Sequence, residues 1–282
     1  MVSSKPDLDR LVRSALEEDL GEDGADITTD AVVDPKLMGE AFVVARKPGV
    51  LSGANAAARV FELVTPPCDY HALVADGARV KEGDQVARVA GSLASILTAE
   101  RTALNFLQRM SGIATLTRRY ADALAAFPKV TLLDTRKTTP GLRSLERAAV
   151  RAGGGHNHRD GLWDAILIKD NHLAAAGGAT VAIERARRAR MPVEVEVDTL
   201  EQLREALDAG AETILLDNMS PELMRRSVEM TAGRARLEAS GGMTIEGVVA
   251  AAEAGVDRIS VGALTHSATA LDLSLEVTKT WL

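Results

Sequence analysis

The sequence predicts an α/β protein in which a small α+β unit precedes a parallel sheet of repeating βα units. Beyond Lys129, short aliphatic runs that end in polar residues alternate with helical patterns. Two stretches, residues 201–218 and 246–262, repeat each other as a helix, an Ala-Gly turn and a strand. Aromatic residues make up only 3% of the chain and small aliphatic residues abound, which favours cores of helices packed on parallel strands.

The first part of the chain predicts the α+β unit. Residues 7–20 carry leucine, valine and alanine at helical spacing, and two glycines then end that helix. A strand, a helix and two short strands follow, at residues 40–50, 53–64, 70–74 and 85–90. Residues 95–127 again show a helical pattern, with a break expected at Ser111 and Gly112.

Six short strands are expected in the second part of the chain. They occupy residues 130–134, 165–170, 193–198, 213–218, 236–240 and 258–262. Gly210 and Gly255 hold matching places in the two repeated stretches. Repeating βα units with short loops imply parallel strands joined by right-handed crossovers. Strands of such similar length favour a barrel over an open sheet.

The composition excludes several classes of function. The chain has 282 residues, enough for one large or two ordinary domains, and a net charge of −7. This acidity and the scarcity of aromatic residues argue against nucleic-acid binding. No apolar stretch approaches the ~20 residues of a membrane span, and the first ten residues lack the apolar run of a secretory signal. Cys68 is the only cysteine, so no intrachain disulfide can form, and we expect a cytoplasmic protein.

A cationic segment lies within this acidic chain. From Arg136 to Lys169 there are seven lysines and arginines against three acids, a local balance of +4. The simplest reason for such a segment is a small, strongly anionic ligand.

The ends of the predicted strands give a second signal. In βα barrels the active site lies at the carboxyl ends of the strands. Those positions hold cations, acids, an amide and small residues here: Arg136, Lys137, Lys169, Asp170, Glu196, Asp198, Asp217, Asn218, Ser240 and Gly262. Every strand must end in something polar, but lysines and acids that converge on one mouth favour a site for charged ligands.

Two glycine-containing turns after the late strands are typical of phosphate sites in barrels. Residues 240–242, Ser-Gly-Gly, precede a helix that begins at Thr244, and residues 261–263, Val-Gly-Ala, follow the last strand. Glu196 and Asp217 end neighbouring strands. They could hold Mg²⁺ through the oxygens of a ligand, or only balance the lysines.

Further anion-binding groups are expected between the first two barrel strands. Thr139 and Pro140 fit the cap and first position of a helix whose N–H groups would face an anion. Arg159 fits a bidentate clamp for a carboxylate. His156 and His158 could ligate zinc only with further ligands, and none stands nearby in the sequence.

Several long motifs resemble the quinolinate phosphoribosyltransferase family. In chain order they are ADITTD, TAERTALNFLQRMSGIAT, TRKTTPGLR, RAGGGHNHR, LIKDNH, VEVEVD, ILLDN, SGG and VGALTHS. The match covers nearly the whole chain, and Ala25 is a small departure from the family's usual glycine. The resemblance implies an N-terminal α/β sandwich domain, residues 1–110, and a seven-stranded incomplete α/β (TIM-like) barrel, residues 111–267. It also implies a C-terminal helix, residues 268–282, that packs on the first domain.

The resemblance implies an activity as well, that of a carboxylating nicotinate-nucleotide diphosphorylase, a pentosyltransferase. Quinolinate and phosphoribosyl pyrophosphate, with Mg²⁺, would give nicotinate mononucleotide, pyrophosphate and CO₂ in de novo NAD biosynthesis. The expected assembly is at least a homodimer, in which Arg101 reaches the active site of the partner chain.

By the same resemblance, cationic residues hold the two carboxylates of quinolinate: Arg136, His158, Arg159, Lys169 and the partner's Arg101. The expected catalytic residues face the ribose, the pyrophosphate and the metal: Lys137, Glu196 and Asp217. The full set of expected substrate contacts is Arg101, Thr135, Arg136, Lys137, His158, Arg159, Lys169, Glu196, Asp217, Ser240, Gly241, Gly242, Val261, Gly262 and Ala263.

Three other interpretations stay open at the level of the sequence. A Schiff-base lyase would use Lys169 as a desolvated, neutral amine. A paralogue of the same shape could use another base, such as nicotinate, or be a molybdenum-associated relative. A non-catalytic anion-binding protein would tolerate the loss of Glu196 and Asp217.

Overall fold

The computed structural model describes residues 5–282, and it divides the chain into two compact units. The first unit takes the described residues up to Arg118 together with Thr139–Gly154 and Ala268–Leu282. The second unit takes Arg119–Thr138 and Gly155–Ser267. The predicted domain boundary after residue 110 falls inside one long helix and does not coincide with this division. The first four residues of the predicted first domain lie outside the described part.

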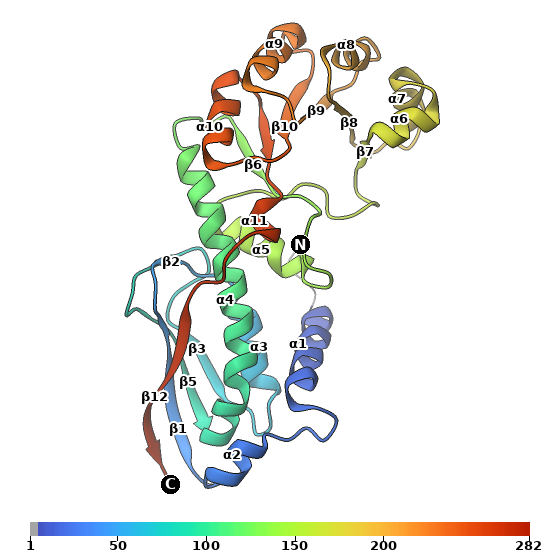
Figure 1. The fold of residues 1–282 in the computed structure, drawn as a ribbon. Coiled ribbons are helices and arrows are strands. Elements are labelled where there is room, and N and C mark those ends of the chain that lie inside the picture. The colour runs from blue at the N-terminus through green and yellow to red at the C-terminus, as the bar shows by residue number, and fades with distance from the viewer. Residues whose placement is uncertain (1–4) are drawn as a thin grey trace. The chain divides into compact units, whose positions relative to one another are not determined.

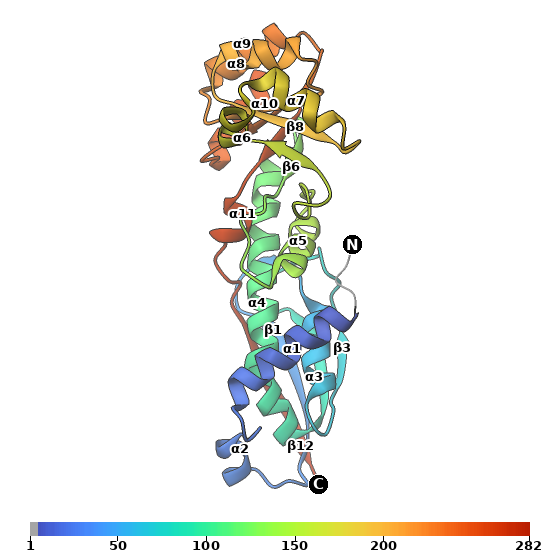
Figure 2. The same ribbon diagram turned by 90° about the vertical axis from the view of Figure 1, so that its right-hand side faces the viewer.

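The first unit is built on a four-stranded antiparallel sheet in the order β12-β1-β5-β3. Its strands are β1 (Met38–Ala45), β2 (Gly49–Val50), β3 (Asp69–Ala72), β4 (Arg79–Val80), β5 (Gln85–Ser92) and β12 (Leu273–Trp281), with β2 and β4 forming a separate pair. Its helices are α1 (Lys5–Leu20), α2 (Ile27–Val32), α3 (Ala54–Leu63), α4 (Leu93–Ala123) and α5 (Arg143–Ala152). Helices α1 and α3 lie side by side (Figures 1 and 2). The core includes the fully buried Phe61, Ile96 and Leu107.

The predicted C-terminal helix is wrong, because residues 273–281 form strand β12. This strand pairs antiparallel with β1, from Ala45 opposite Leu273 to Met38 opposite Trp281 (Figure 1). The segment LSLEVTKTW alternates apolar and polar residues over much of its length and contains β-branched and aromatic residues. Period-2 alternation is the signature of a strand with one face covered.

The break expected at Ser111 and Gly112 is also wrong, since α4 is continuous through both residues. Ser111 Oγ accepts the Ser52 N–H at 3.0 Å and donates to the Ser52 carbonyl at 3.1 Å. A Cβ atom at Gly112 would lie 2.2 Å from the Thr269 carbonyl oxygen. The two small residues therefore allow other segments of the first unit to pack against the helix, and do not end it.

The second unit contains the six predicted strands in one parallel sheet, in the order β6-β11-β10-β9-β8-β7. They are β6 (Thr131–Leu133), β7 (Ile166–Ile168), β8 (Val193–Val197), β9 (Thr213–Asp217), β10 (Arg236–Ser240) and β11 (Arg258–Ser260). Six strands are formed within the described residues where the resemblance implied seven. A single parallel bridge between Leu133 and His156 marks the place of the seventh, on the free edge of β6. The α/β barrel architecture is confirmed.

Short helices connect these strands: α6 (Asp170–Ala176), α7 (Ala179–Arg187), α8 (Leu200–Asp208), α9 (Pro221–Thr231) and α10 (Ile245–Ala254). A further short helix, α11 (Ala263–His266), follows β11. Helices α8, α9 and α10 begin in the same way. The hydroxyl oxygens of Thr199, Ser220 and Thr244 each accept a backbone N–H of the first turn. The strand end and the capping residue are only a few positions apart, so the polar residues between them stay at the carboxyl edge of the sheet.

Candidate active site

The carboxyl edge of the parallel sheet collects one predicted site residue from each strand. In sheet order they are Lys137 after β6, Gly262 after β11, Ser240 on β10, Asp217 on β9, Glu196 on β8 and Lys169 after β7. Asp217 and Ser240 are direct neighbours in the register of β9 and β10. The structure therefore brings these six together at one end of the second unit, as the sequence predicts.

Lys169 and Glu196 form an ion pair between their side chains. Lys169 also stands at the N-cap of α6, where its backbone N–H donates to His172 Nδ1 at 2.9 Å. The side chain of Lys169 is ion-paired and about half exposed, which is not the desolvated setting that a Schiff-base lyase would need.

The turn after β9 is shaped by Asn218, whose φ of 52° lies in the left-handed region. Its side-chain amide donates to Asp217 Oδ2 at 2.7 Å, and its backbone N–H donates to the Ser240 carbonyl at 2.9 Å. A Cβ atom at Gly241 would lie 2.1 Å from Asn218 Oδ1. Glycine at this position therefore lets the Ser-Gly-Gly turn approach the end of β9.

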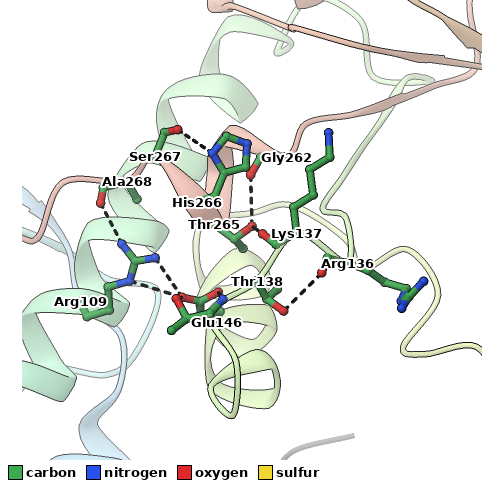
Figure 3. Close-up of polar contacts among 11 residues, drawn as sticks. Arg109, Arg136, Lys137, Thr138, Glu146, Gly262, Thr265, His266, Ser267 and Ala268 are labelled. Atoms are coloured by element: carbon green, nitrogen blue, oxygen red, sulfur yellow. Dashed lines mark hydrogen bonds and ion pairs between the residues drawn. The ribbon is translucent and has the colours of Figure 1, made fainter.

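Lys137 is held by its backbone. The buried Thr265 hydroxyl donates to the Lys137 carbonyl at 2.7 Å, with the Gly262 carbonyl 3.1 Å away (Figure 3). A Cβ atom at Gly262 would lie 3.0 Å from Lys137 Cδ and 3.1 Å from His266 Nε2. Thr265 and His266 were not among the predicted site residues, although both belong to the VGALTHS motif and follow Gly262 by three and four residues.

Arg136 and Lys137 point in different directions (Figure 3). Arg159 donates to the Ala165 carbonyl at 3.1 Å. Burial lowers the pKa of Arg159, and the nearby charge of Arg136 lowers it further. Two guanidinium groups that repel each other in this way provide an environment suited to a ligand with two carboxylates.

The expected helix cap at Thr139 is wrong, because α5 begins at Arg143 with Leu142 at the N-cap. In the first unit, the Thr139 N–H and hydroxyl donate to the two oxygens of Glu146 at 3.1 and 2.8 Å. Arg109 donates to the same buried carboxylate at 2.9 Å (Figure 3). A side chain of the helix thus takes the donor groups of Thr139, and the expected cap does not form.

The His158 side chain contacts two glutamate side chains inside the barrel. Its Nε2 lies 2.9 Å from Glu194 Oε2 and 3.4 Å from Glu238 Oε1, and both glutamates are buried. Burial lowers the pKa of His158, but hydrogen bonds to Glu194 and Glu238 outweigh this effect and raise it to about 10. The buried Asp134 accepts the His158 backbone N–H at 2.7 Å. A contact of His158 with a substrate carboxylate stays a prediction.

Glu194 and Glu238 are absent from the sequence-based site. Each lies two residues before a predicted site residue, Glu196 on β8 and Ser240 on β10, and so on the same face of its strand. This period-2 spacing is the signal that could have found them. They also supply, with His158, a three-ligand set that a metal could use, which the sequence analysis found lacking.

Two expected residues have positions but no tested role. Thr135 Oγ1 accepts the Lys137 backbone N–H at 3.1 Å. Arg101 is exposed on α4 in the first unit. Its reach into a partner chain stays a prediction. No helix in the described part of the chain has the length and apolar character needed to span a membrane.

Comparison with known proteins gives consistent matches over nearly the full length. The model of the quinolinate phosphoribosyl transferase N-terminal domain matches residues 26–111, and that of the C-terminal domain matches residues 113–276. The probable nicotinate-nucleotide pyrophosphorylase [carboxylating] of Bacillus subtilis is 42% identical over 96% of this chain and 93% of its own. The Mycobacterium leprae protein of that name is 44% identical over 94% of this chain and 95% of its own. A solved nicotinate-nucleotide pyrophosphorylase from Francisella tularensis is 40% identical, with a TM-score of 0.92 over 98% of this chain and 97% of its own.

Proposed function

The chain belongs to the quinolinate phosphoribosyltransferase family, and on this premise we propose how its site transfers a phosphoribosyl group to quinolinate. The activity is that of a carboxylating pentosyltransferase of NAD biosynthesis, which turns quinolinate and phosphoribosyl pyrophosphate into nicotinate mononucleotide, pyrophosphate and CO₂. The observation that carries the residue assignments is the carboxyl edge of the sheet. It combines clustered cations, two acids on neighbouring strands and two glycine turns.

The cations of the second unit bind the dicarboxylate. Arg136 and Arg159 share one electrostatic environment and supply planar donor groups that match carboxylates. Lys169 adds a third positive charge and is held by Glu196. We propose that Arg101 of a second copy completes the clamp, which makes the active form at least a homodimer.

The remaining residues of the carboxyl edge bind phosphoribosyl pyrophosphate. Lys137 and the neighbouring His266 ring face anionic oxygens, and the turns at residues 240–242 and 261–263 hold the 5′-phosphate. Glu196 and Asp217 supply hard oxygen donors on adjacent strands, and this donor set fits Mg²⁺ bound jointly with phosphate oxygens. When bound, Mg²⁺ would neutralise charge on the leaving pyrophosphate.

The reaction depends more on the alignment of the two substrates than on proton transfer. The pyridine nitrogen forms a bond to ribose C1 while the bond from C1 to the pyrophosphate oxygen breaks, and Lys137 stabilises the departing charge. Glu196 and Asp217 stabilise positive charge that develops on the ribose. The bond from pyridine C2 to its carboxylate then breaks and CO₂ leaves. The electron pair stays on C2 beside the cationic nitrogen until C2 takes up a proton.

The test is product formation by the purified protein with quinolinate, phosphoribosyl pyrophosphate and Mg²⁺, with nicotinate as the parallel substrate. We expect nicotinate mononucleotide, pyrophosphate and CO₂ in equal amounts from quinolinate, and no product from nicotinate. Product from nicotinate would move the chain to a paralogous activity. No product from either substrate would contradict the proposed function.

A further inference from the structure

An arginine without a partner lies beside an acidic segment in the first unit. The side chain of Arg101 on α4 is exposed and forms no hydrogen bond or ion pair with the described residues. Residues 17–30 include seven acids and no lysine or arginine, and they run beside the first turns of α4 (Figures 1 and 2). Opposite charges at this range attract each other, so the free guanidinium needs a physical reason.

The helix that carries Arg101 offers it no acidic neighbour. Residues three and four positions apart on a helix face each other, with their Cβ atoms about 5–6 Å apart. At those positions from Arg101, α4 has only uncharged residues: Leu97, Thr98, Leu104 and Asn105. Glu100 does not face Arg101, because consecutive residues point to different sides of a helix. The carboxylates that touch this stretch of α4 belong instead to the acidic segment.

The first of these carboxylates is Asp26, in the ADITTD motif, which has no role in the proposed site. Its Oδ1 accepts the Thr29 N–H at 3.0 Å and so caps α2, and its Oδ2 accepts the Thr29 hydroxyl at 2.6 Å. The Thr98 hydroxyl donates to the same Oδ2 at 3.1 Å, from one turn before Arg101. Hydrogen bonds, chiefly from Thr29 and also from Thr98, hold the pKa of Asp26 below its ordinary value. Asp26 is therefore a charged carboxylate whose contact with α4 is taken by a hydroxyl.

A second pair repeats this arrangement one turn further along α4. The hydroxyl of Thr102 is buried and donates to Asp19 Oδ2 at 3.4 Å. Thr98 and Thr102 are four positions apart, so they lie on one face of the helix. Both threonines thus offer a neutral donor to an acid that lies close to Arg101.

The cavities of the first unit show the same separation. Asp26 and Thr98 line a cavity of about 410 Å³, and Asp19 and Thr102 line another of about 250 Å³. Arg101 lines neither cavity, so its side chain points away from both pairs. Because each carboxylate borders open space, it has room to turn toward Arg101 if the threonine hydroxyl that holds it is lost.

We propose that Thr98 and Thr102 are positioning residues for Arg101, because they hold Asp26 and Asp19 and so keep its guanidinium unpaired and available to the active site of a second copy. The inference rests on the proposed function, in which that guanidinium binds a carboxylate of quinolinate. An Arg101 paired within its own chain would first have to leave its carboxylate. Quinolinate binding would then weaken by the strength of an exposed ion pair, which corresponds to roughly two- to fivefold.

Four variants separate this role from a general loss of stability. Thr98→Val keeps the shape of the side chain and removes the hydroxyl that holds Asp26. Asp26→Asn removes the charge and still caps α2, since asparagine caps helices as well as aspartate does. The third variant combines both changes. Thr115→Val is the matched control, because this hydroxyl of the same helix bonds only backbone groups of Val50.

The measured quantity is the KM for quinolinate at about 0.1 M and about 1 M salt. We expect Thr98→Val to raise this KM roughly two- to fivefold at the lower salt concentration and less at the higher one, because salt screens exposed ion pairs. Asp26→Asn and the double variant should stay near the wild type, since neither leaves a free carboxylate beside Arg101. Thr115→Val should lower the melting temperature only. Thr102→Val should repeat the defect of Thr98→Val, and adding Asp19→Asn should remove it.

A structural role would give another pattern. If the hydrogen bond between Thr98 and Asp26 only stabilised the fold, Asp26→Asn and the double variant would be as impaired as Thr98→Val. That result, or a defect of the same size at both salt concentrations, would overturn the positioning role.

Mixed dimers show on which chain the change acts. In a heterodimer purified by two different tags, Lys137→Ala inactivates the site of one chain and leaves the other site intact. Thr98→Val on the Lys137→Ala chain should raise the KM of the intact site, because that chain supplies its Arg101. Thr98→Val on the other chain should leave this KM unchanged. The opposite pattern would overturn the proposal.

A crystal structure of Thr98→Val tests the pairing without any substrate. We expect Arg101 to form an ion pair with Asp26 of its own chain, and an Arg101 that stays unpaired would overturn the inference. If the ion pair forms but the wild type makes no product from quinolinate, the proposed function fails while the control of Arg101 by Thr98 stands.

Discussion

Replacing Thr265 by valine tests how the fold holds Lys137 in place. The Thr265 hydroxyl is completely buried and donates to the Lys137 carbonyl at 2.7 Å. Valine has nearly the same shape and lacks the donor. The change therefore removes the hydrogen bonds of this hydroxyl to the Lys137 and Gly262 carbonyls, and it leaves the partly buried Lys137 carbonyl without this donor, without opening a cavity.

The size of the effect follows from that carbonyl. An unsatisfied buried acceptor costs about 1–3 kcal/mol. If this cost falls on the position of Lys137 in the transition state, kcat/KM for phosphoribosyl pyrophosphate drops roughly 5-fold to 150-fold, because about 1.4 kcal/mol is a factor of ten. The melting temperature should fall by about 2–4 °C for each kcal/mol lost. The KM for quinolinate should stay near the wild-type value.

The chain offers a matched control in Thr231. Its hydroxyl is also buried, but it has no hydrogen-bond partner within the described part of the chain, so valine there removes nothing. Thr265→Ser keeps the donor and should recover most of the activity. Steady-state kinetics with both substrates, together with thermal unfolding, compare the three variants. Equal kcat/KM values for Thr265→Val and Thr231→Val would refute the reasoning, and so would a Thr265→Ser variant as impaired as the valine variant.

Three further predictions concern the clamp, the dimer and pH. Arg159→Ala should raise the KM for quinolinate at least tenfold, since it removes a charge-assisted bidentate contact, and an unchanged KM would contradict the clamp. The variants Arg101→Ala and Lys137→Ala should each be inactive alone. When the two are unfolded and refolded together, activity should return, because a mixed dimer holds one site with both residues intact. A lack of recovery would place Arg101 outside the partner's site. The raised pKa of His158, about 10, means that the stability it contributes is complete below its ordinary value of 6.5 and is lost as pH rises through 10. Between pH 7 and pH 10, the free energy of unfolding measured with urea should therefore fall more for the wild type than for Glu238→Gln. Equal losses of stability would contradict this pH dependence.

The parts of the fold that are determined by residues close together in the sequence were predictable. All six barrel strands were found, because each aliphatic run ends in polar residues and is followed by a capped helix or a turn. The carboxyl edge followed from that pattern, since parallel strands place their ends together. Lys137, Lys169, Glu196 and Asp217 could therefore be assigned to one edge without coordinates.

The parts that depend on distant residues were not predictable in the same way. Thr139 has the composition of a helix cap, but Glu146 and Arg109 take its donor groups. Gly112 resembles a helix break, whereas it makes room for another backbone segment. Glu194 and Glu238 resemble ordinary strand residues until the barrel turns them toward His158. In each case a contact far along the chain decides which local preference is satisfied.

The place of β12 in the first sheet has a consequence for synthesis on the ribosome. The strand pairs with β1 alone and forms an edge of the sheet, yet about 180 residues separate it from β5, the neighbour on the other side of β1. At typical rates of translation those residues take roughly 10–40 s to appear. During that interval the nascent first unit exposes the bare edge of β1, which is a template for unwanted pairing. The unit that starts first is therefore the last to be completed, and chaperone demand should be greatest while the barrel is still being made.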